Sequence, residues 1–154
     1  MGNTWTVGTT VSAGVNYPYS RFAQQVNSVL QDSRGWRKRG YRFRWVPYKS
    51  NPHIRIKLTS AAQMKHMFPQ FEDIQVSVCD MKTRRIYLRE DRWLQGVPWF
   101  PTLAAYRMYL INHEVGHALG YHHEPCTPGQ PSPIMTQQTP TSFLTTQCLP
   151  TSTL

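Results

Sequence analysis

Residues 113–123 read His-Glu-Val-Gly-His-Ala-Leu-Gly-Tyr-His-His, and this segment constrains the structure more than any other part of the chain. His113 and His117 are four residues apart, so on an α-helix their imidazoles lie on one face, about one turn apart. Glu114 projects about 100° around the helix axis from His113. Two imidazoles at this spacing can bind one zinc ion, and the carboxylate between them can reach a water molecule without being a ligand. The segment therefore predicts a helix that carries a zinc site.

Gly120 indicates where a third ligand comes from. A catalytic zinc takes three protein ligands and keeps one position open. A glycine can adopt the left-handed backbone that ends a helix, so Gly120 can turn a later histidine back toward the metal. The only acidic residue after this turn is Glu124, and residues 125–154 contain no charged residue, which argues against a carboxylate ligand. We expect His123 as the third ligand, from its spacing after the glycine, with His122 as the alternative.

The motif helix is expected to span residues 101–119. Apolar side chains before and within the motif follow one another at intervals of 4, 3, 4 and 3 residues, so they form a stripe that packs against a core. Pro101 suits the first turn of such a helix. The two histidines are expected roughly opposite the stripe. Its members are Ala104, Met108, Ile111, Val115 and Ala118.

The remaining chain begins with a mixture of strand and helix patterns. Apolar residues at helical spacing predict a helix over residues 19–33, with Ser20 as a candidate cap and Gly35 as its end. Alternating apolar and polar residues predict strands, and residues 80–83 are few enough to form a hairpin between the last two. The expected strands cover residues 4–11, 41–46, 53–59, 73–79 and 84–89.

This order of elements predicts an α+β fold. We expect a twisted, mostly parallel sheet of about five strands, two main helices and an irregular C-terminal subdomain. The 154 residues suit one domain. We divide it into a sheet-and-helix part, residues 1–119, and a loop-rich part, residues 120–154, in which Pro, Thr, Ser and Gln predominate.

The three cysteines favour one disulfide and one free thiol. No pair has CxxC spacing, which argues against a thiolate zinc site. Cys126 and Cys148 both lie in the loop-rich tail and are expected to be joined, which indicates an oxidising compartment. Cys79 is then a buried core thiol, although its pairing with either of the others is an open alternative.

The chain is expected to be exported and not to span a membrane. No run approaches the roughly 18 apolar residues that a span needs. Residues 1–6 lack the basic start and apolar stretch of a signal peptide. We therefore expect a mature extracellular or cell-surface domain from which any signal or pro-segment is absent.

The formal charge of +9 is concentrated in two stretches, residues 34–44 and 82–92. Such a charge can steer an acidic partner, a substrate or a membrane surface toward the protein. A solvated basic face is the simpler interpretation. No nucleic-acid-binding module accompanies the charge, so no specific nucleic-acid partner is expected.

Taken together, His113, Glu114, His117, Gly120 and His123 resemble the extended HExxHxxGxxH motif of the metzincin zinc metallopeptidases. This resemblance implies a second feature, a tight turn that places a methionine beneath the metal.

Residues 132–135, Ser-Pro-Ile-Met, look like that Met-turn, with Met135 as its methionine. Some metzincins carry a tyrosine two positions later, where this chain has Gln137, so no tyrosine role is carried over. The chain is similar to small, poorly characterised bacterial members of the clan.

The resemblance implies a zinc-dependent endopeptidase with one catalytic zinc held by His113, His117 and His123. Glu114 would act as general base toward a zinc-activated water, and Met135 would pack beneath the histidines. A protein or peptide substrate would bind extended along an edge strand of the sheet, for which residues 73–79 are the candidate, while residues 128–140 wall the pocket.

We expect a monomer. The alternative function is a non-catalytic, zinc-containing binding protein whose basic surface takes acidic partners.

Overall fold

A computed structural model describes residues 3–154, so Met1 and Gly2, the start of the segment expected not to be a signal peptide, lie outside the described residues. Five strands and seven helical segments follow one another along the described chain. In order they are β1 (Thr4–Val11), α1 (Tyr19–Gln31), η1 (Trp36–Arg39), β2 (Arg42–Trp45), β3 (Ile54–Thr59), α2 (Ala61–Met67), η2 (Pro69–Phe71), β4 (Val78–Asp80), β5 (Arg85–Arg89), α3 (Glu90–Gln95), α4 (Leu103–Ala118) and η3 (Thr141–Thr146).

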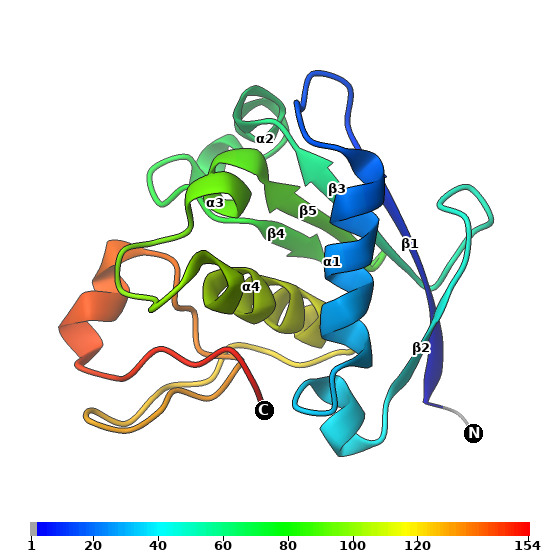
Figure 1. Ribbon diagram of the computed structural model, residues 1–154. Coiled ribbons are helices and arrows are strands. Elements are labelled where there is room, and N and C mark those ends of the chain that lie inside the picture. Colours follow the sequence, from blue (N-terminus) through cyan, green and yellow to red (C-terminus); the bar gives the residue numbers. More distant parts are fainter. Residues whose placement is uncertain (1–2) are drawn as a thin grey trace.

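The strands form one twisted sheet in the order β2-β1-β3-β5-β4 (Figure 1). The first four run parallel to their neighbours, and β4 alone pairs antiparallel, with β5. The turn after Asp80 joins these two strands into the expected hairpin, with the Arg84 amide donating to the Asp80 carbonyl at 2.8 Å. The fold is α+β with a mostly parallel five-stranded sheet, as the sequence predicts.

The two long helices, α1 and α4, lie on the same face of the sheet (Figure 1). Side chains alternate between the two faces of a strand, so every second residue points toward these helices. Those residues form the buried core face of the sheet. They include Val7, Ile54, Ile56, Leu58, Ile86 and Leu88.

Helix α4 begins behind a side-chain cap and is buried along its second half. The Thr102 hydroxyl accepts a hydrogen bond from the Ala105 amide at 3.0 Å and caps the first turn, so Pro101 precedes the helix and does not open it. Burial is also wider than one stripe. Residues 109–116 are all buried, whereas Ala104 is exposed, because α1, the sheet and the C-terminal tail surround the second half of the helix.

Other sequence predictions about local structure are also wrong. Helix α1 ends at Gln31 and not at Gly35. Ser20 does not cap α1, because the helix already begins at Tyr19 behind Pro18. Residues 73–79 are a strand only from Val78. Ile74 and Gln75 instead close a turn onto the Phe71 carbonyl, and Gln75 is left-handed at φ 51°.

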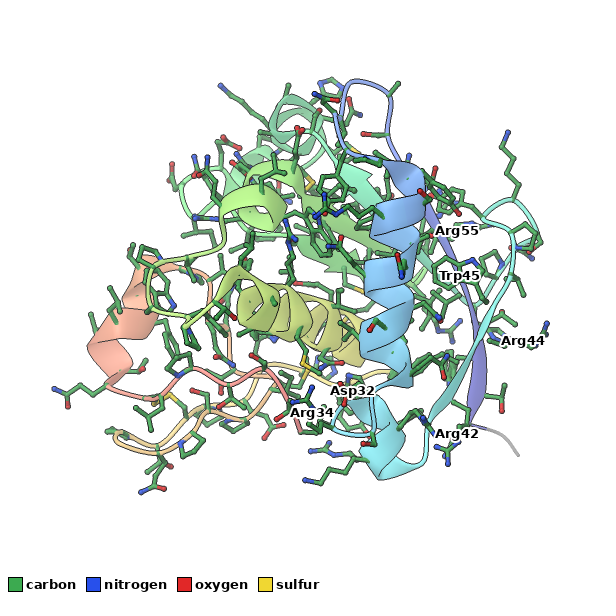
Figure 2. All side chains as sticks on the ribbon, in the orientation of Figure 1. Asp32, Arg34, Arg42, Arg44, Trp45 and Arg55 are labelled. Atoms are coloured by element: carbon green, nitrogen blue, oxygen red, sulfur yellow. A yellow bond between two sulfur atoms is a disulfide. The ribbon has the colours of Figure 1, made fainter. Side chains whose placement is uncertain are left out.

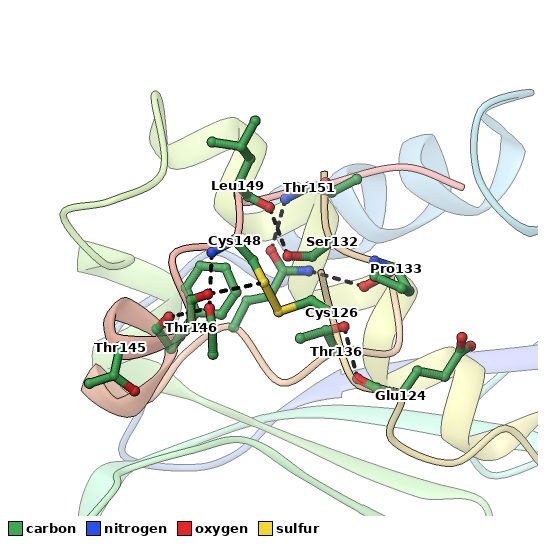
Figure 3. Close-up of a disulfide and its surroundings, with 12 residues drawn as sticks. Glu124, Cys126, Ser132, Pro133, Thr136, Thr145, Thr146, Cys148, Leu149 and Thr151 are labelled. Atoms are coloured by element: carbon green, nitrogen blue, oxygen red, sulfur yellow. Dashed lines mark hydrogen bonds between the residues drawn. A yellow bond between two sulfur atoms is a disulfide. The ribbon is translucent and has the colours of Figure 1, made fainter. Parts of the chain in front are cut away.

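The C-terminal tail is irregular but well tied (Figure 3). A disulfide joins Cys126 to Cys148, as expected, and Cys79 is a free, half-buried thiol. The Ser132 hydroxyl donates to the Leu149 carbonyl at 2.7 Å, which holds the two arms of the tail together near the disulfide. The Thr136 hydroxyl bonds the Glu124 carbonyl at 2.9 Å and fixes the start of the tail against its middle.

Candidate metal centre

His113, His117 and His123 converge on one point. One nitrogen from each ring lies within 4.8 Å of the others, the spacing of three ligands around a single metal ion. The ring centroids are 4.9 Å apart for His113 and His117, and 4.7 Å apart for His117 and His123. His122 is exposed and is not part of this cluster. The three histidines that the sequence predicts as ligands are therefore the ones that the fold brings together.

Backbone carbonyls set the orientation of the two helical rings. Nδ1 of His113 lies 2.8 Å from the Ile134 carbonyl, and Nδ1 of His117 lies 2.8 Å from the Tyr121 carbonyl. A carbonyl only accepts, so each Nδ1 carries the hydrogen and each Nε2 has a free lone pair. This is the tautomer that a metal needs, with the outer partner that usually supports a metal-binding histidine.

The turn after α4 delivers the third ring. Gly120 has φ 105°, a conformation that side chains disfavour. Its amide bonds the His117 carbonyl at 3.0 Å, and the Tyr121 amide bonds the Gly116 carbonyl at 2.9 Å, which is the pattern of a glycine-terminated helix. The chain reverses here and lays the His123 ring over that of His113, with centroids 5.2 Å apart.

Met135 is fully buried and packs against Gly116 of α4, the residue before His117. A β-carbon at Gly116 would overlap the Met135 sulfur and would lie 2.7 Å from the Trp36 ring. Trp36 also donates from Nε1 to the Asn112 carbonyl at 2.8 Å. Gly116, Met135 and Trp36 thus meet from three distant parts of the chain. Sequence reasoning missed Gly116 and Trp36 because their roles depend on that packing.

Burial keeps the ring nitrogens unprotonated. Desolvation, with a smaller contribution from the neighbouring rings, lowers the pKa of His113 to about 3 and that of His117 to about 4. The pKa of His123 is also lowered, first by burial and then by His122. All three rings are therefore neutral at physiological pH, the form that binds a metal.

Glu114 faces the same space as the histidines but is not a member of their cluster. Its side chain is buried, and within residues 3–154 no hydrogen-bond donor reaches the carboxylate. Burial raises the pKa of Glu114 from 4.5 to about 8. A buried carboxyl group with a raised pKa and three histidines thus share one cleft.

A cleft of about 210 Å³ opens over the metal site between two walls. One wall is the edge strand β4 with the segment before it, and the other is the tail after Met135. Residues 73–79, expected as the substrate edge, contribute Val76, Ser77, Val78 and Cys79, and the tail contributes Gln137 and Thr139. Gln137 thus faces the cleft from the position where some metzincins have a tyrosine.

The model of a protein family described as "Protein of unknown function (DUF3152)" matches residues 3–147, most of the chain. The chain belongs to the DUF3152 family. No curated protein matches it. Among solved structures, one of myroilysin is 20% identical, with a TM-score of 0.50, and the match covers 83% of this chain and 52% of that one.

A second structure of myroilysin is also 20% identical and has a TM-score of 0.47, and the match covers 82% of this chain and 47% of that one. This DUF3152 chain therefore spans about half the length of myroilysin, and the likeness is one of fold.

Tyr109 packs against the histidine cluster of this DUF3152 domain and was not assigned from the sequence. Tyr109 precedes His113 by about one turn of α4, and the centroids of the two rings are 5.2 Å apart. Its hydroxyl accepts from the Gln138 amide at 2.8 Å, so it ties the helix to the tail wall of the cleft. The position of Tyr109, four residues before the first histidine, is the signal that places it on the same helix face.

Proposed function

We propose that this chain is a zinc-dependent endopeptidase of the metzincin kind. The observation that carries the proposal is the meeting of three neutral imidazoles and one buried carboxyl group, Glu114, in a single cleft. A structural metal site is closed by four protein ligands, whereas three ligands beside a cleft leave a position for water and substrate. A general base has no purpose in a structural site.

The residues suit zinc. Three imidazole nitrogens with oriented tautomers are a donor set that zinc favours, and no thiolate or carboxylate belongs to the cluster. When bound, zinc lowers the pKa of a water molecule and polarises a carbonyl group. His113, His117 and His123 would hold it.

Glu114 would then move the proton. A nearby cation favours the ionised carboxylate, which offsets the effect of burial on its pKa. The ionised Glu114 would accept a proton from the attacking water and deliver it to the amine that leaves when the peptide bond breaks. The enclosed position keeps bulk water from competing for that proton.

The substrate would be an extended peptide segment. β4 is one of the two edge strands of the sheet, and its residues Val78 and Cys79 line the cleft. An extended chain can add to such an edge through backbone hydrogen bonds, while the cleft selects side chains. Phe71, Met81 and Tyr109 give the cleft apolar surface.

The proposed setting is extracellular or at the cell surface. The Cys126–Cys148 disulfide is the support for it, because disulfides persist in oxidising compartments. Within the described part of the chain, no helix is long and apolar enough to cross a bilayer.

A cleavage assay on an unfolded protein substrate tests the proposal, with zinc content measured in the same samples. Glu114→Ala should keep zinc and lose cleavage by at least about 100-fold, the lower range for a general base. Glu124→Gln is the matched control, because it removes an exposed carboxylate close to the site and should leave cleavage unchanged. Zinc-loaded wild type without cleavage would favour the alternative, a zinc-containing binding protein.

A further inference from the structure

The face of the sheet opposite α1 and α4 carries an unusual concentration of positive charge. Paired residues in a parallel ladder point to the same face, so the register identifies its members. Arg42 and Arg44 pair with Thr4 and Thr6 of β1, and neither Arg shares a face with buried Phe43. Both arginines are exposed.

The next strands extend this charged face. Arg55 and Lys57 of β3 pair with Gly8 and Thr10 of β1, and Arg55 also pairs with Arg85 of β5. Their neighbours Ile54, Ile56 and Ile86 point into the core on the other side. Figure 2 shows Arg42, Arg44 and Arg55 along the β1–β2 side of the molecule, away from α4.

The loop between β2 and β3 crosses β1 on this face and adds another cation. A β-carbon on Gly8 would lie 2.8 Å from the Tyr48 backbone, which places the loop directly over β1. Arg55 donates from Nε to the Tyr48 carbonyl at 3.2 Å, and Lys49 beside it is exposed. The basic face defined in this way consists of Arg42, Arg44, Lys49, Arg55, Lys57 and Arg85.

These six cations have no carboxylate partner within residues 3–154. Arg89 of β5 differs from these six residues in its environment. It lies on the same face of the sheet, but there the segment from α2 to Glu72 covers the sheet. Arg89 is buried and bonds both Glu72 and Asp91, at 3.1 and 2.8 Å. The chain thus neutralises the basic residue that it buries on this face. It leaves the exposed Arg42, Arg44, Lys49 and Arg85 and the half-buried Arg55 and Lys57 without a carboxylate partner within residues 3–154.

The arrangement is complementary to a broad anionic surface. The six residues come from three strands and a loop, so they spread in two dimensions, and none lines the cleft over the three histidines. None of the exposed large apolar side chains belongs to the sheet positions that make up the face. Such a face suits electrostatic contact with headgroups and not insertion among acyl chains.

We propose that the basic face docks this domain on an anionic lipid bilayer. His113, Glu114 and His117 of the cleft lie on α4, which covers the opposite, core side of the sheet. Docking through the basic face therefore leaves the cleft open to solvent. The proposal does not depend on the chemistry of the metal site.

Co-sedimentation with vesicles tests this inference. Full-length protein should bind phosphatidylcholine vesicles that contain about one third phosphatidylserine, and should not bind pure phosphatidylcholine. Binding should weaken steeply as salt rises, because the charges are exposed and screened. Arg44→Gln should weaken binding about fivefold, and Arg42→Gln with Arg44→Gln about thirtyfold.

Arg21→Gln is the matched control, because it removes one exposed charge from α1 on the other side of the sheet. It should bind like wild type, and thermal melting should show all variants folded. Equal weakening by Arg21→Gln and Arg44→Gln would overturn the proposal. So would tighter binding, at the same salt, to duplex DNA or poly-glutamate than to the anionic vesicles.

Discussion

The sulfur of Met135 occupies the space that a β-carbon on Gly116 would take. Gly116 lies between the two helical histidines, so the absence of a side chain there lets the segment that contains Met135 approach the helix closely. The packing of Met135 thus depends on the same stretch of helix that spaces His113 and His117.

Gly116→Ala should therefore destabilise the protein although alanine favours helices. The added methyl group must displace the Met135 sulfur or the Trp36 ring, and overpacking of this kind costs about 1–3 kcal/mol. Urea unfolding monitored by tryptophan fluorescence measures the change.

A double-mutant cycle separates this clash from a general helix effect. Met135→Ala alone should cost about 2–5 kcal/mol, because it opens a cavity beneath α4. In the double variant the new methyl group fills part of that cavity, so the two costs should not add. Costs that sum within about 0.5 kcal/mol would show that the two residues do not compete for space.

Removal of the Glu114 carboxylate should stabilise the metal-free protein at neutral pH. Burial raises its folded pKa from 4.5 to about 8, so the unfolded state releases this proton first as pH rises. Stability is therefore lost between these two values and is unaffected below the lower one. Glu114→Gln should gain about 3 kcal/mol at pH 7 relative to wild type, and nothing near pH 4.

Chelator-treated samples melted across this pH range provide the measurement. Glu124→Gln, at an exposed carboxylate, should track wild type throughout. A stability difference that stayed constant from pH 4 to pH 8 would mean that Glu114 is ionised in the metal-free fold.

His123 and His122 should differ sharply in metal binding. His123 belongs to the cluster and His122 does not, so His123→Ala should weaken zinc affinity by more than the roughly 10- to 100-fold that loss of a supporting residue costs. His122→Ala should leave the affinity within a few-fold of wild type. Competition with a zinc chelator gives both constants, and a larger loss for His122→Ala would refute the ligand assignment.

Reduction of Cys126–Cys148 should loosen the tail that walls the cleft. The bond spans 22 residues, and closing a loop of this size stabilises by about 3 kcal/mol on the chain-entropy account. Cys126→Ser with Cys148→Ser should lower the free energy of unfolding by that amount. Thiol titration of denatured wild type should give one free cysteine, and three would contradict the bond.

The metal cluster was largely predictable because its geometry is local. His113 and His117 share a helix face, and Gly120 must end that helix for His123 to return. The Cys126–Cys148 pair is separated by only 22 positions and lies in the loop-rich tail, where η3 is a single short helix. In each case a few consecutive residues contain the information.

Features that depend on distant contacts were not predictable. Ile74 alternates with Val76 and Val78 as in a strand, but the Arg92 guanidinium holds the Gln75 carbonyl at 2.8 Å and Ile74 turns outward. Helix α2 is too short, at 7 residues, for its single buried Met64 to establish a helical period. The sequence shows basic stretches that contain Arg42, Arg44 and Arg85, but not that these residues share one face of the sheet with Arg55 and Lys57, because that depends on the pairing of separate strands.

The β4–β5 hairpin is the only ladder of the described sheet that joins strands separated by a short turn. Local pairings have a low entropy cost of loop closure. The parallel ladders join strands separated by helices and long loops, so their closure costs more entropy. During folding, the edge of the cleft can therefore form early and alone. The contact among Trp36, Gly116 of α4 and Met135 needs distant parts of the chain to meet. The ligands therefore gain their final orientation only when the whole chain has collapsed.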